Sequence, residues 1–179
     1  MIVVIGGTPG SGKTTVAERF AERYGYVLVS AGAMFRQMAA AHGKDIVAYS
    51  GEAERDHSID RELDRRVLED VLRHDTFGSD VIVDGRIQGH LLALRGVPCL
   101  KVWIDAPADL RADRVAGRDG KTVDEARTEI SFRERSERTR YLAIYGIEVR
   151  DTNAYDLVVD SAGKAPEDIV ELVWSRVAA

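Results

Sequence analysis

The fold is set by the stretch Gly7-Thr8-Pro9-Gly10-Ser11-Gly12-Lys13-Thr14, which comes almost directly after the apolar residues 2–5. It matches the pattern G-x-x-x-x-G-K-[S/T], and its neighbours predict a strand before it and a helix after it. Glycines at this spacing let consecutive backbone N–H groups turn inward around a phosphate, and the start of the helix adds its positive dipole end. The stretch therefore predicts a phosphate-binding loop (P-loop) after the first strand.

Three side chains of this loop have predicted contacts with a nucleoside triphosphate. Lys13 reaches the β- and γ-phosphates, Thr14 ligates the accompanying Mg²⁺, and Thr15 bonds on the side of the α-phosphate. The predicted donor site comprises Gly7, Thr8, Pro9, Gly10, Ser11, Gly12, Lys13, Thr14 and Thr15.

Short β-rich runs alternate with helical patterns along the whole chain. Strands are expected at residues 2–5, 27–29, 81–83, 100–104 and 157–159, and helices at residues 14–24, 31–42, 59–74, 108–117, 122–145 and 167–177. Strand alternating with helix predicts parallel pairing with right-handed crossovers. The predicted fold is a three-layer α/β/α sandwich of the P-loop class with a five-stranded parallel sheet.

Length and composition indicate one domain over residues 1–179. A chain of 179 residues fits one domain on a scale of roughly 150 residues per domain. No repeat, low-complexity stretch or linker divides it, so we expect a core of residues 1–30, 80–110 and 150–179. Two stretches are longer than a simple crossover requires. They predict an inserted helical segment at about residues 31–79 and a small lid at about residues 111–140.

Charge and cysteine content limit the partners and the compartment. The 25 Lys and Arg against 30 Asp and Glu give a net charge of −5, which argues against nucleic acid or an anionic membrane as partner. The single cysteine, Cys99, excludes an internal disulfide framework. No apolar run approaches the ~18 residues of a transmembrane helix, and the first residues lack the features of a signal peptide. We expect a cytoplasmic monomer with small-molecule partners.

Arginines and one aspartate distinguish a small kinase from the other P-loop classes. A GTPase switch should carry an Asn-Lys-x-Asp motif, which is absent from the sequence. Phosphoryl transfer between small molecules needs a second anion site opposite the P-loop. Arg36 follows the second predicted strand, and Asp84-Gly85-Arg86 follows the third. Because ligands of open α/β sheets gather at the carboxyl ends of strands, we expect Asp84 to support Mg²⁺ with Thr14, and Arg86 to face Lys13.

The helical stretch Arg133-Glu134-Arg135-Ser136-Glu137-Arg138-Thr139-Arg140 supplies further charges. Arg133 and Arg140 lie seven residues apart and share one face with Glu137. Two guanidinium groups on this face could bind phosphates while Glu137 accepts from a ribose hydroxyl. We expect Arg135 and Arg138 to make ordinary pairs along the helix.

A mobile flap is predicted ahead of this helix. In the turn Gly117-Arg118-Asp119-Gly120, two glycines flank a charged tip. We expect the turn to place Arg114 and Arg118 over the phosphates of the donor.

With these residues the chain resembles nucleoside monophosphate kinases, most closely the cytidylate kinases of the short archaeal form. The resemblance rests on the P-loop and on six further stretches: residues 30–36, 59–64 (Ile-Asp-Arg-Glu-Leu-Asp), 84–89 (Asp-Gly-Arg-Ile-Gln-Gly), 133–140, 145–147 and 155–160. Adenylate kinases usually carry Asp-Gly-Phe-Pro-Arg where this chain has residues 84–88, which favours the cytidylate kinases. Larger bacterial cytidylate kinases have a serine where this chain has Ala31.

The resemblance implies an activity and a set of site residues. The activity is ATP-dependent phosphorylation of CMP or dCMP to CDP or dCDP by in-line transfer, with Mg²⁺ as the metal. The backbone after Asp160 would face the adenine of ATP, and residues 31–79 would bind the acceptor. The expected catalytic residues are Lys13, Arg86, Arg133 and Arg140. The expected acceptor site comprises Ser30, Gly32, Arg36, Asp60, Arg86, Arg133, Glu137 and Arg140; Asp60, Asp64 and Ser30 are candidates for reading the base.

Three alternatives stay open at this point. The acceptor could be AMP or UMP, with every catalytic residue unchanged. It could instead be a non-nucleotide such as shikimate or a sugar acid. In a different class, the P-loop could sense ATP in a binding module without turnover, although the cluster of arginines speaks against this reading.

Overall fold

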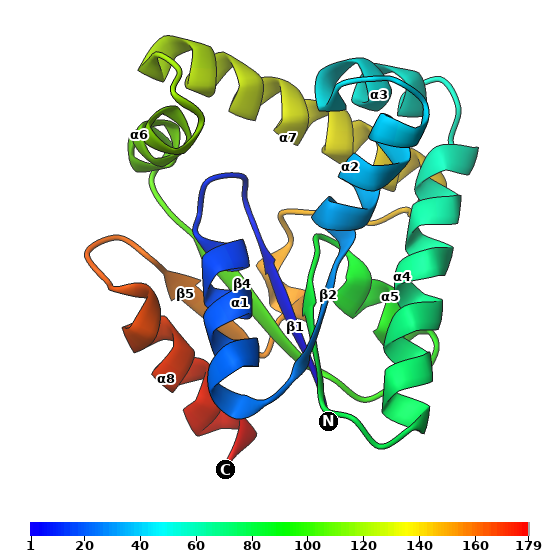
Figure 1. Cartoon of the computed structure of the whole chain (residues 1–179), viewed down its shortest axis with the longest axis vertical. Coiled ribbons are helices and arrows are strands. Elements are labelled where there is room, and N and C mark those ends of the chain that lie inside the picture. The colour runs from blue at the N-terminus through cyan, green and yellow to red at the C-terminus, as the bar shows by residue number, and fades with distance from the viewer. Residues whose placement is uncertain (179) are drawn as a thin grey trace.

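Five strands form one parallel sheet in the order β2-β3-β1-β4-β5 (Figure 1). The structure is a computed structural model that describes residues 1–178. The strands are β1 (Ile2–Gly7), β2 (Val27–Ser30), β3 (Val81–Asp84), β4 (Leu100–Asp105) and β5 (Leu157–Asp160). β1 pairs with β3 on one side and with β4 on the other, so the P-loop leaves the middle of the sheet. The five predicted strands and their parallel pairing are confirmed.

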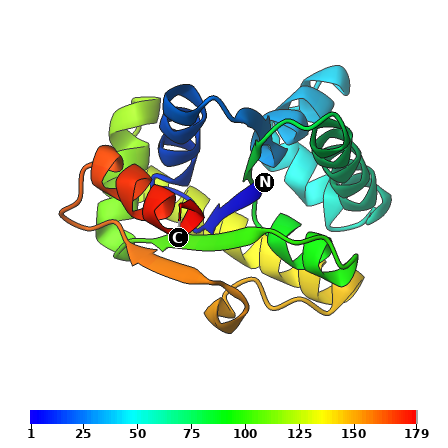
Figure 2. The ribbon, with the colours of Figure 1, turned by 90° about the horizontal axis from the view of Figure 1, so that it is seen from below.

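Helices cover both faces of the sheet because side chains alternate along its buried strands. Val3 and Ile5 pack toward α1 (Lys13–Tyr24) and α8 (Pro166–Val177), which Figure 2 shows together on one side of the sheet. Ile2 belongs to the opposite core. That core is formed with α2 (Ala31–Ala41), α4 (Ser58–Thr76), α5 (Gln88–Leu94) and the end of α7 (Val123–Tyr145). The predicted three-layer α/β/α fold is confirmed.

The segment between β2 and β3 does not have a core of its own. It contains α2, the short α3 (Ile46–Ala53) and α4. Leu63, Val67 and Val71 of α4 are buried in the same cluster as the strand residues Val81 and Val83. α4 is therefore the crossover helix of the sheet, while α2 and α3 project above the carboxyl edge of the strands (Figure 1). The sequence patterns predicted neither α3 nor α5.

The flap predicted at residues 117–120 is wrong. Gly117, Arg118 and Asp119 belong to α6 (Ala108–Asp119), which ends at Gly120 with φ +64°. Thr122 then begins α7 with a capping box, in which its side chain and that of Glu125 bond each other's backbone N–H groups. These signals join the two helices by a short link of three residues, Gly120 to Thr122. α6 and α7 also share a small core, made of Ala112, Val115, Ala116, Ala126 and Ile130.

Within residues 1–178, no helix combines the length and the apolar character that crossing a membrane requires.

The core between α1 and α8 makes a stability prediction. Phe20 is 0% exposed and its ring meets that of Tyr26 edge to face, with centroids 5.0 Å apart. Phe20→Ala is expected to lower the free energy of unfolding by about 3–5 kcal/mol, because it removes a buried ring and leaves a cavity. Phe77 is 80% exposed, so Phe77→Ala should change the same quantity by no more than about 0.5 kcal/mol. Urea denaturation measures both, and equal losses would contradict this assignment of the core.

Candidate active site

The P-loop occupies the carboxyl edge of the sheet between β1 and α1. Gly10 and Gly12 have φ of +80° and +93°, in the left-handed region that favours glycine. No side chain caps the N-terminus of α1. The first N–H groups of that helix thus point to the place where a phosphate would bind.

Two residues at the start of α1 meet the last residues of β2 and β3 beside this loop. The Thr14 hydroxyl donates to Asp84 Oδ2 at 2.9 Å, and the Ser30 hydroxyl donates to the same oxygen at 3.2 Å. Lys13 Nζ lies 3.8 Å from Asp84 Oδ1, which is buried without a hydrogen-bond partner among the described residues. A buried carboxylate next to a threonine hydroxyl is the oxygen donor set that Mg²⁺ prefers. The pair predicted to hold the metal, Thr14 and Asp84, is thus in direct contact.

Lys13 lies in a concentration of positive charge. The pKa of Lys13 is lowered to about 8, chiefly by burial; the guanidinium groups of Arg86 and Arg133 act in the same direction, while Asp84 and Glu137 oppose the change. The ammonium group is therefore poorly compensated in the absence of an anion. A bound polyphosphate would supply the missing negative charge.

Arg86 connects the P-loop to α7. Its Nη1 donates to the carbonyl oxygen of Gly7 at 2.6 Å, and its Nε lies 3.0 Å from Glu137 Oε2. Burial opposes ionisation of Glu137, but the guanidinium groups of Arg86, Arg133 and Arg140 bring its pKa below the ordinary value. Glu137 is thus an ionised carboxylate that forms an ion pair with the guanidinium of Arg86. The ribose contact expected for Glu137 stays a prediction.

Arg133 keeps most of its hydrogen-bonding capacity. Its guanidinium lies 3.8 Å from Glu129 Oε1 and its side chain is 27% exposed. Lys13, Arg86, Arg133 and Glu137, which the sequence placed in one site, are close enough to influence one another's protonation.

Arg140 differs from the prediction, because it is buried away from the P-loop. Its Nε lies 2.8 Å from Asp60 Oδ2, with side chains 4% and 0% exposed, and its Nη1 donates to Ser136 Oγ at 2.7 Å. Burial raises the pKa of Asp60 even though Arg140 favours the ionised form. Arg140 lies beside Asp60 and not at the P-loop because a carboxylate in the interior needs a cation close by. Arg140 and Asp60 therefore join α7 to α4.

Asp64 extends this polar interior by one turn of α4. It accepts hydrogen bonds from Gln88 Nε2 and from the Tyr145 hydroxyl, each at 2.9 Å. Burial raises the pKa of Asp64 to about 7, and the neighbouring Asp60 acts in the same direction. Gln88 and Tyr145 were missed as polar partners because neither carries a charge. Their positions inside residues 84–89 and 145–147, two of the stretches that carry the resemblance, were the available signal.

Arg36 lies at the rim of the site. It is exposed on α2, and within residues 1–178 it makes no hydrogen bond or ion pair. Gly32 is also exposed, and a Cβ added there would lie 3.5 Å from Arg36 Nη1. Ser30 caps α2 by accepting from the N–H of Ala33 at 3.2 Å. The structure thus places Ser30 beside Asp84, and Arg36 and Gly32 at the surface.

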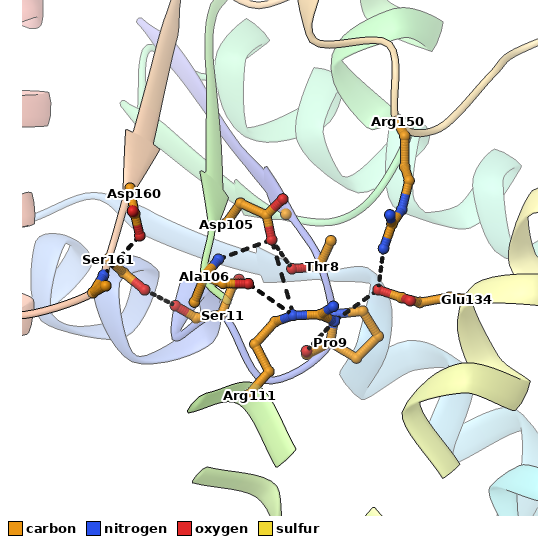
Figure 3. Close-up of polar contacts among 12 residues, drawn as sticks. Thr8, Pro9, Ser11, Asp105, Ala106, Arg111, Glu134, Arg150, Asp160 and Ser161 are labelled. Carbon is orange, nitrogen blue, oxygen red and sulfur yellow. Dashed lines mark hydrogen bonds and ion pairs between the residues drawn. The ribbon is translucent and has the colours of Figure 1, made fainter. Parts of the chain in front are cut away.

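A pocket of about 310 Å³ lies between the P-loop, α6 and the loop after β5. Arg114 Nη1 donates to Ser161 Oγ at 2.8 Å and to the carbonyl oxygen of Ser11 at 3.2 Å. Figure 3 shows Ser161 bonded to Ser11, a contact of 2.8 Å. Arg118 also lines the pocket, and its Nε is paired with Asp119 at 2.6 Å. The size of the pocket suits a small organic ligand.

The sheet order and the P-loop define the fold of the P-loop kinases, as the comparison with solved structures confirms. An uncharacterized protein from Eubacterium ventriosum superposes with a TM-score of 0.75 over 100% of this chain and 99% of its own, at 16% identity. Shikimate kinase from Acinetobacter baumannii superposes with a TM-score of 0.60 over 99% of this chain and 92% of its own, also at 16% identity. At these identities the likeness shows the fold alone.

Sequence comparison identifies the family. The cytidylate kinase-like family matches residues 2–163. Cytidylate kinase from Methanopyrus kandleri is 44% identical over an alignment of 184 positions, which covers 99% of this chain and 93% of that protein. Cytidylate kinase from Pyrococcus furiosus is 39% identical over 177 residues, covering 99% and 88%. The chain belongs to the cytidylate kinase-like family, and the resemblance seen in its motifs is confirmed.

The raised pKa of Asp64 predicts how stability depends on pH. The unfolded chain loses this proton near the ordinary value of 3.8, whereas the folded protein keeps it up to about pH 7. Between these values the free energy of unfolding should fall as pH rises, by up to about 1.4 kcal/mol per pH unit, because the unfolded state binds fewer protons. Asp64→Asn removes this titration. Urea denaturation from pH 4 to 8 should therefore show the wild type losing stability relative to Asp64→Asn, and parallel curves would contradict the assignment.

Proposed function

We propose that this protein catalyses ATP-dependent phosphorylation of CMP, with dCMP as a further acceptor. The observation that carries the proposal is the convergence of Lys13, Arg86 and Arg133 beside the Thr14–Asp84 pair, in a chain of the cytidylate kinase-like family. Two anionic phosphates need this density of positive charge in order to approach each other. A module that only senses ATP would not need it on the acceptor side.

Transfer proceeds in line and requires no general base. The acceptor phosphate is largely ionised at neutral pH, because its second pKa is ~6. One of its oxygens attacks the γ-phosphorus, a new P–O bond forms, and the bond to the oxygen bridging the β- and γ-phosphates breaks to release ADP. Lys13, Arg86 and Arg133 stabilise the charge on the transferred group, and their fixed positions supply most of the catalysis.

Thr14 and Asp84 would hold Mg²⁺. When bound, the ion neutralises charge on the phosphates of ATP. The support for this assignment is the unpartnered, buried Oδ1 of Asp84 beside the Thr14 hydroxyl.

The donor and acceptor have separate places. The adenosine of ATP fits the pocket lined by Arg114, Arg118 and Ser161. On the acceptor side, α2–α4 of residues 31–79 bind the monophosphate, and Arg36 folds inward onto its phosphate. The same phosphate displaces Glu137 from Arg86 and leaves the carboxylate to accept from the ribose.

The buried pair of Arg140 and Asp60 positions α7 against α4 and does not bind phosphate directly. Arg140→Ala would leave Asp60 buried without a cation, at a cost of about 3–5 kcal/mol in stability. Loss of activity in that variant would therefore mix folding with catalysis.

Residues 111–140 act as a lid over both nucleotides. A monomer in the cytoplasm, working on small molecules alone, fits the acidic net charge of −5 and the single cysteine.

Acceptor choice tests the proposed function. With Mg²⁺ and ATP, we expect release of ADP with CMP and dCMP to exceed release with UMP, AMP or GMP in a coupled assay. Lys13→Met should abolish turnover, since the transferred group loses its ammonium partner. A preference for another base would reject cytidylate specificity, and turnover with shikimate or a sugar acid alone would reject the nucleotide acceptor.

Arg133 provides a cleaner test of the second anion site than Arg140. Arg133→Ala should lower kcat by about 10²–10³-fold, as expected for losing one donor to the transition state. The KM for ATP should stay nearly unchanged, because the P-loop is intact. Arg135, exposed on the same helix, gives the matched control, and Arg135→Ala should retain wild-type kcat. A higher KM for ATP with unchanged kcat would move Arg133 to the donor site.

A further inference from the structure

Two arginines connect the backbone of the P-loop to carboxylates of α7. Arg86 bonds the carbonyl oxygen of Gly7 and pairs with Glu137. Arg111 makes a second connection of the same kind, because its Nη1 donates to the carbonyl oxygen of Pro9 at 3.2 Å and to Glu134 Oε1 at 2.7 Å. Figure 3 shows this second connection, with Arg111 between the P-loop and α7. α7 is thus tied to the P-loop at two points, one helical turn apart.

Arg111 is built into the base of α6. Its side chain is 6% exposed, and its Nε donates to the carbonyl oxygen of Ala106 at 3.0 Å, at the link between β4 and α6. The backbone of the P-loop also touches it, since a Cβ added to Gly10 would lie 2.7 Å from the carbonyl oxygen of Arg111. The apex of the P-loop and the start of α6 are therefore in direct contact. The Arg111 guanidinium donates to a backbone carbonyl on each side of that contact, Pro9 in the P-loop and Ala106 before α6.

The two connections differ in whether a substrate can break them. Arg86 lies in the charge cluster around Lys13, where phosphates bind, and its bond to Glu137 is the one that an acceptor phosphate would replace. Arg111 has two backbone carbonyls, Glu134 and, at 4.0 Å, Asp105 Oδ1 as partners. Glu134 Oε1 also accepts from Arg150 Nη2 at 2.8 Å, but the Arg150 side chain is 56% exposed, so this pair contributes little to holding Glu134. The Arg111 connection therefore persists while the Arg86 connection is exchanged.

We propose that Arg111 is a positioning residue for phosphoryl transfer, which holds α7 on the P-loop through Glu134. This inference rests on the proposed function. Arg133 directly precedes Glu134 on α7, so the Arg111–Glu134 pair fixes the distance between the Arg133 guanidinium and Lys13. Misplacement of a reacting or stabilising group by about 1 Å can cost on the order of 100-fold in rate. When phosphate takes Arg86 from Glu137, the pair at Glu134 keeps Arg133 in place.

Glu134→Ala tests this role while leaving the P-loop contact of Arg111 intact. It should lower kcat for CMP on the order of 10- to 100-fold and leave the KM for ATP nearly unchanged. Glu134→Gln restores an acceptor for Arg111 and should recover part of the rate.

Two substitutions serve as matched controls. Arg150→Ala removes the other partner of Glu134. Arg127→Ala removes an exposed pair between α7 and α6, in which Nη2 lies 3.1 Å from Asp109 Oδ1. Neither reaches the P-loop, so both should keep wild-type kcat.

A double substitution separates positioning from general stability. If Glu134 acts through Arg133, Glu134→Ala should cost little further rate in an Arg133→Ala background, so the two losses will not add. Additive losses, or a fall in melting temperature with kcat unchanged, would overturn the proposal. Equal losses of kcat in Glu134→Ala and Arg150→Ala would also overturn it.

A measurement without turnover distinguishes this inference from the proposed function. ADP binding at the P-loop should slow hydrogen–deuterium exchange in residues 123–145 of the wild type. Glu134→Ala should lose this protection, and Arg150→Ala should retain it. An inactive wild type that shows this pattern would reject the CMP kinase and keep the coupling. Protection that survives in Glu134→Ala would reject the coupling, whatever the acceptor.

Discussion

Burial of several cations close together at the carboxyl edge of the sheet is the constraint on which the arrangement of this protein depends. Lys13, Arg86 and Arg133 lie near one another, and the pKa of Lys13 is lowered chiefly by burial and additionally by the two guanidinium groups. The carboxylates of Asp84 and Glu137 oppose this lowering. These two carboxylates belong to a strand end and to a helix, so compensation of charge also fixes where α7 lies above the sheet.

α7 has a different partner on each of its sides, which explains why no single apolar stripe runs along it. Ala126 and Ile130 pack against α6, and Glu134 continues the same side to Arg111. Glu137 faces Arg86 above the P-loop. Arg140, one turn further on, enters the interior toward Asp60. Position along the helix thus decides whether an arginine is available to a ligand or committed to the structure.

The parts of the site that depend on local sequence could be predicted, whereas those that depend on burial could not. The P-loop and the contact of Thr14 with Asp84 follow from strand ends that meet at one edge of a parallel sheet. Arg140 fits the helical spacing as well as Arg133 does. Only the three-dimensional packing shows that Arg140 forms an ion pair with a buried carboxylate, that of Asp60.

Other features were hidden for related reasons. Nothing in the sequence singled out Arg111, because the backbone carbonyls that it bonds leave no trace in side-chain chemistry. The flap at residues 117–120 was misjudged because a glycine near the end of a helix resembles a glycine in a turn. The helices α3 and α5 are too short for periodicity to reveal them.

The short link between α6 and α7 gives this region the mechanics of a lever. The two helices share a small core of their own, so they resist movement relative to each other. α7 has 23 residues, which at 1.5 Å per residue makes an arm of about 34 Å. A tilt of about 2° at one end of such an arm displaces the other end by about 1 Å, the scale on which transfer rates respond. The ion pairs of Glu134, Glu137 and Arg140 along α7 therefore add to its hydrophobic contacts with α6 in fixing that tilt.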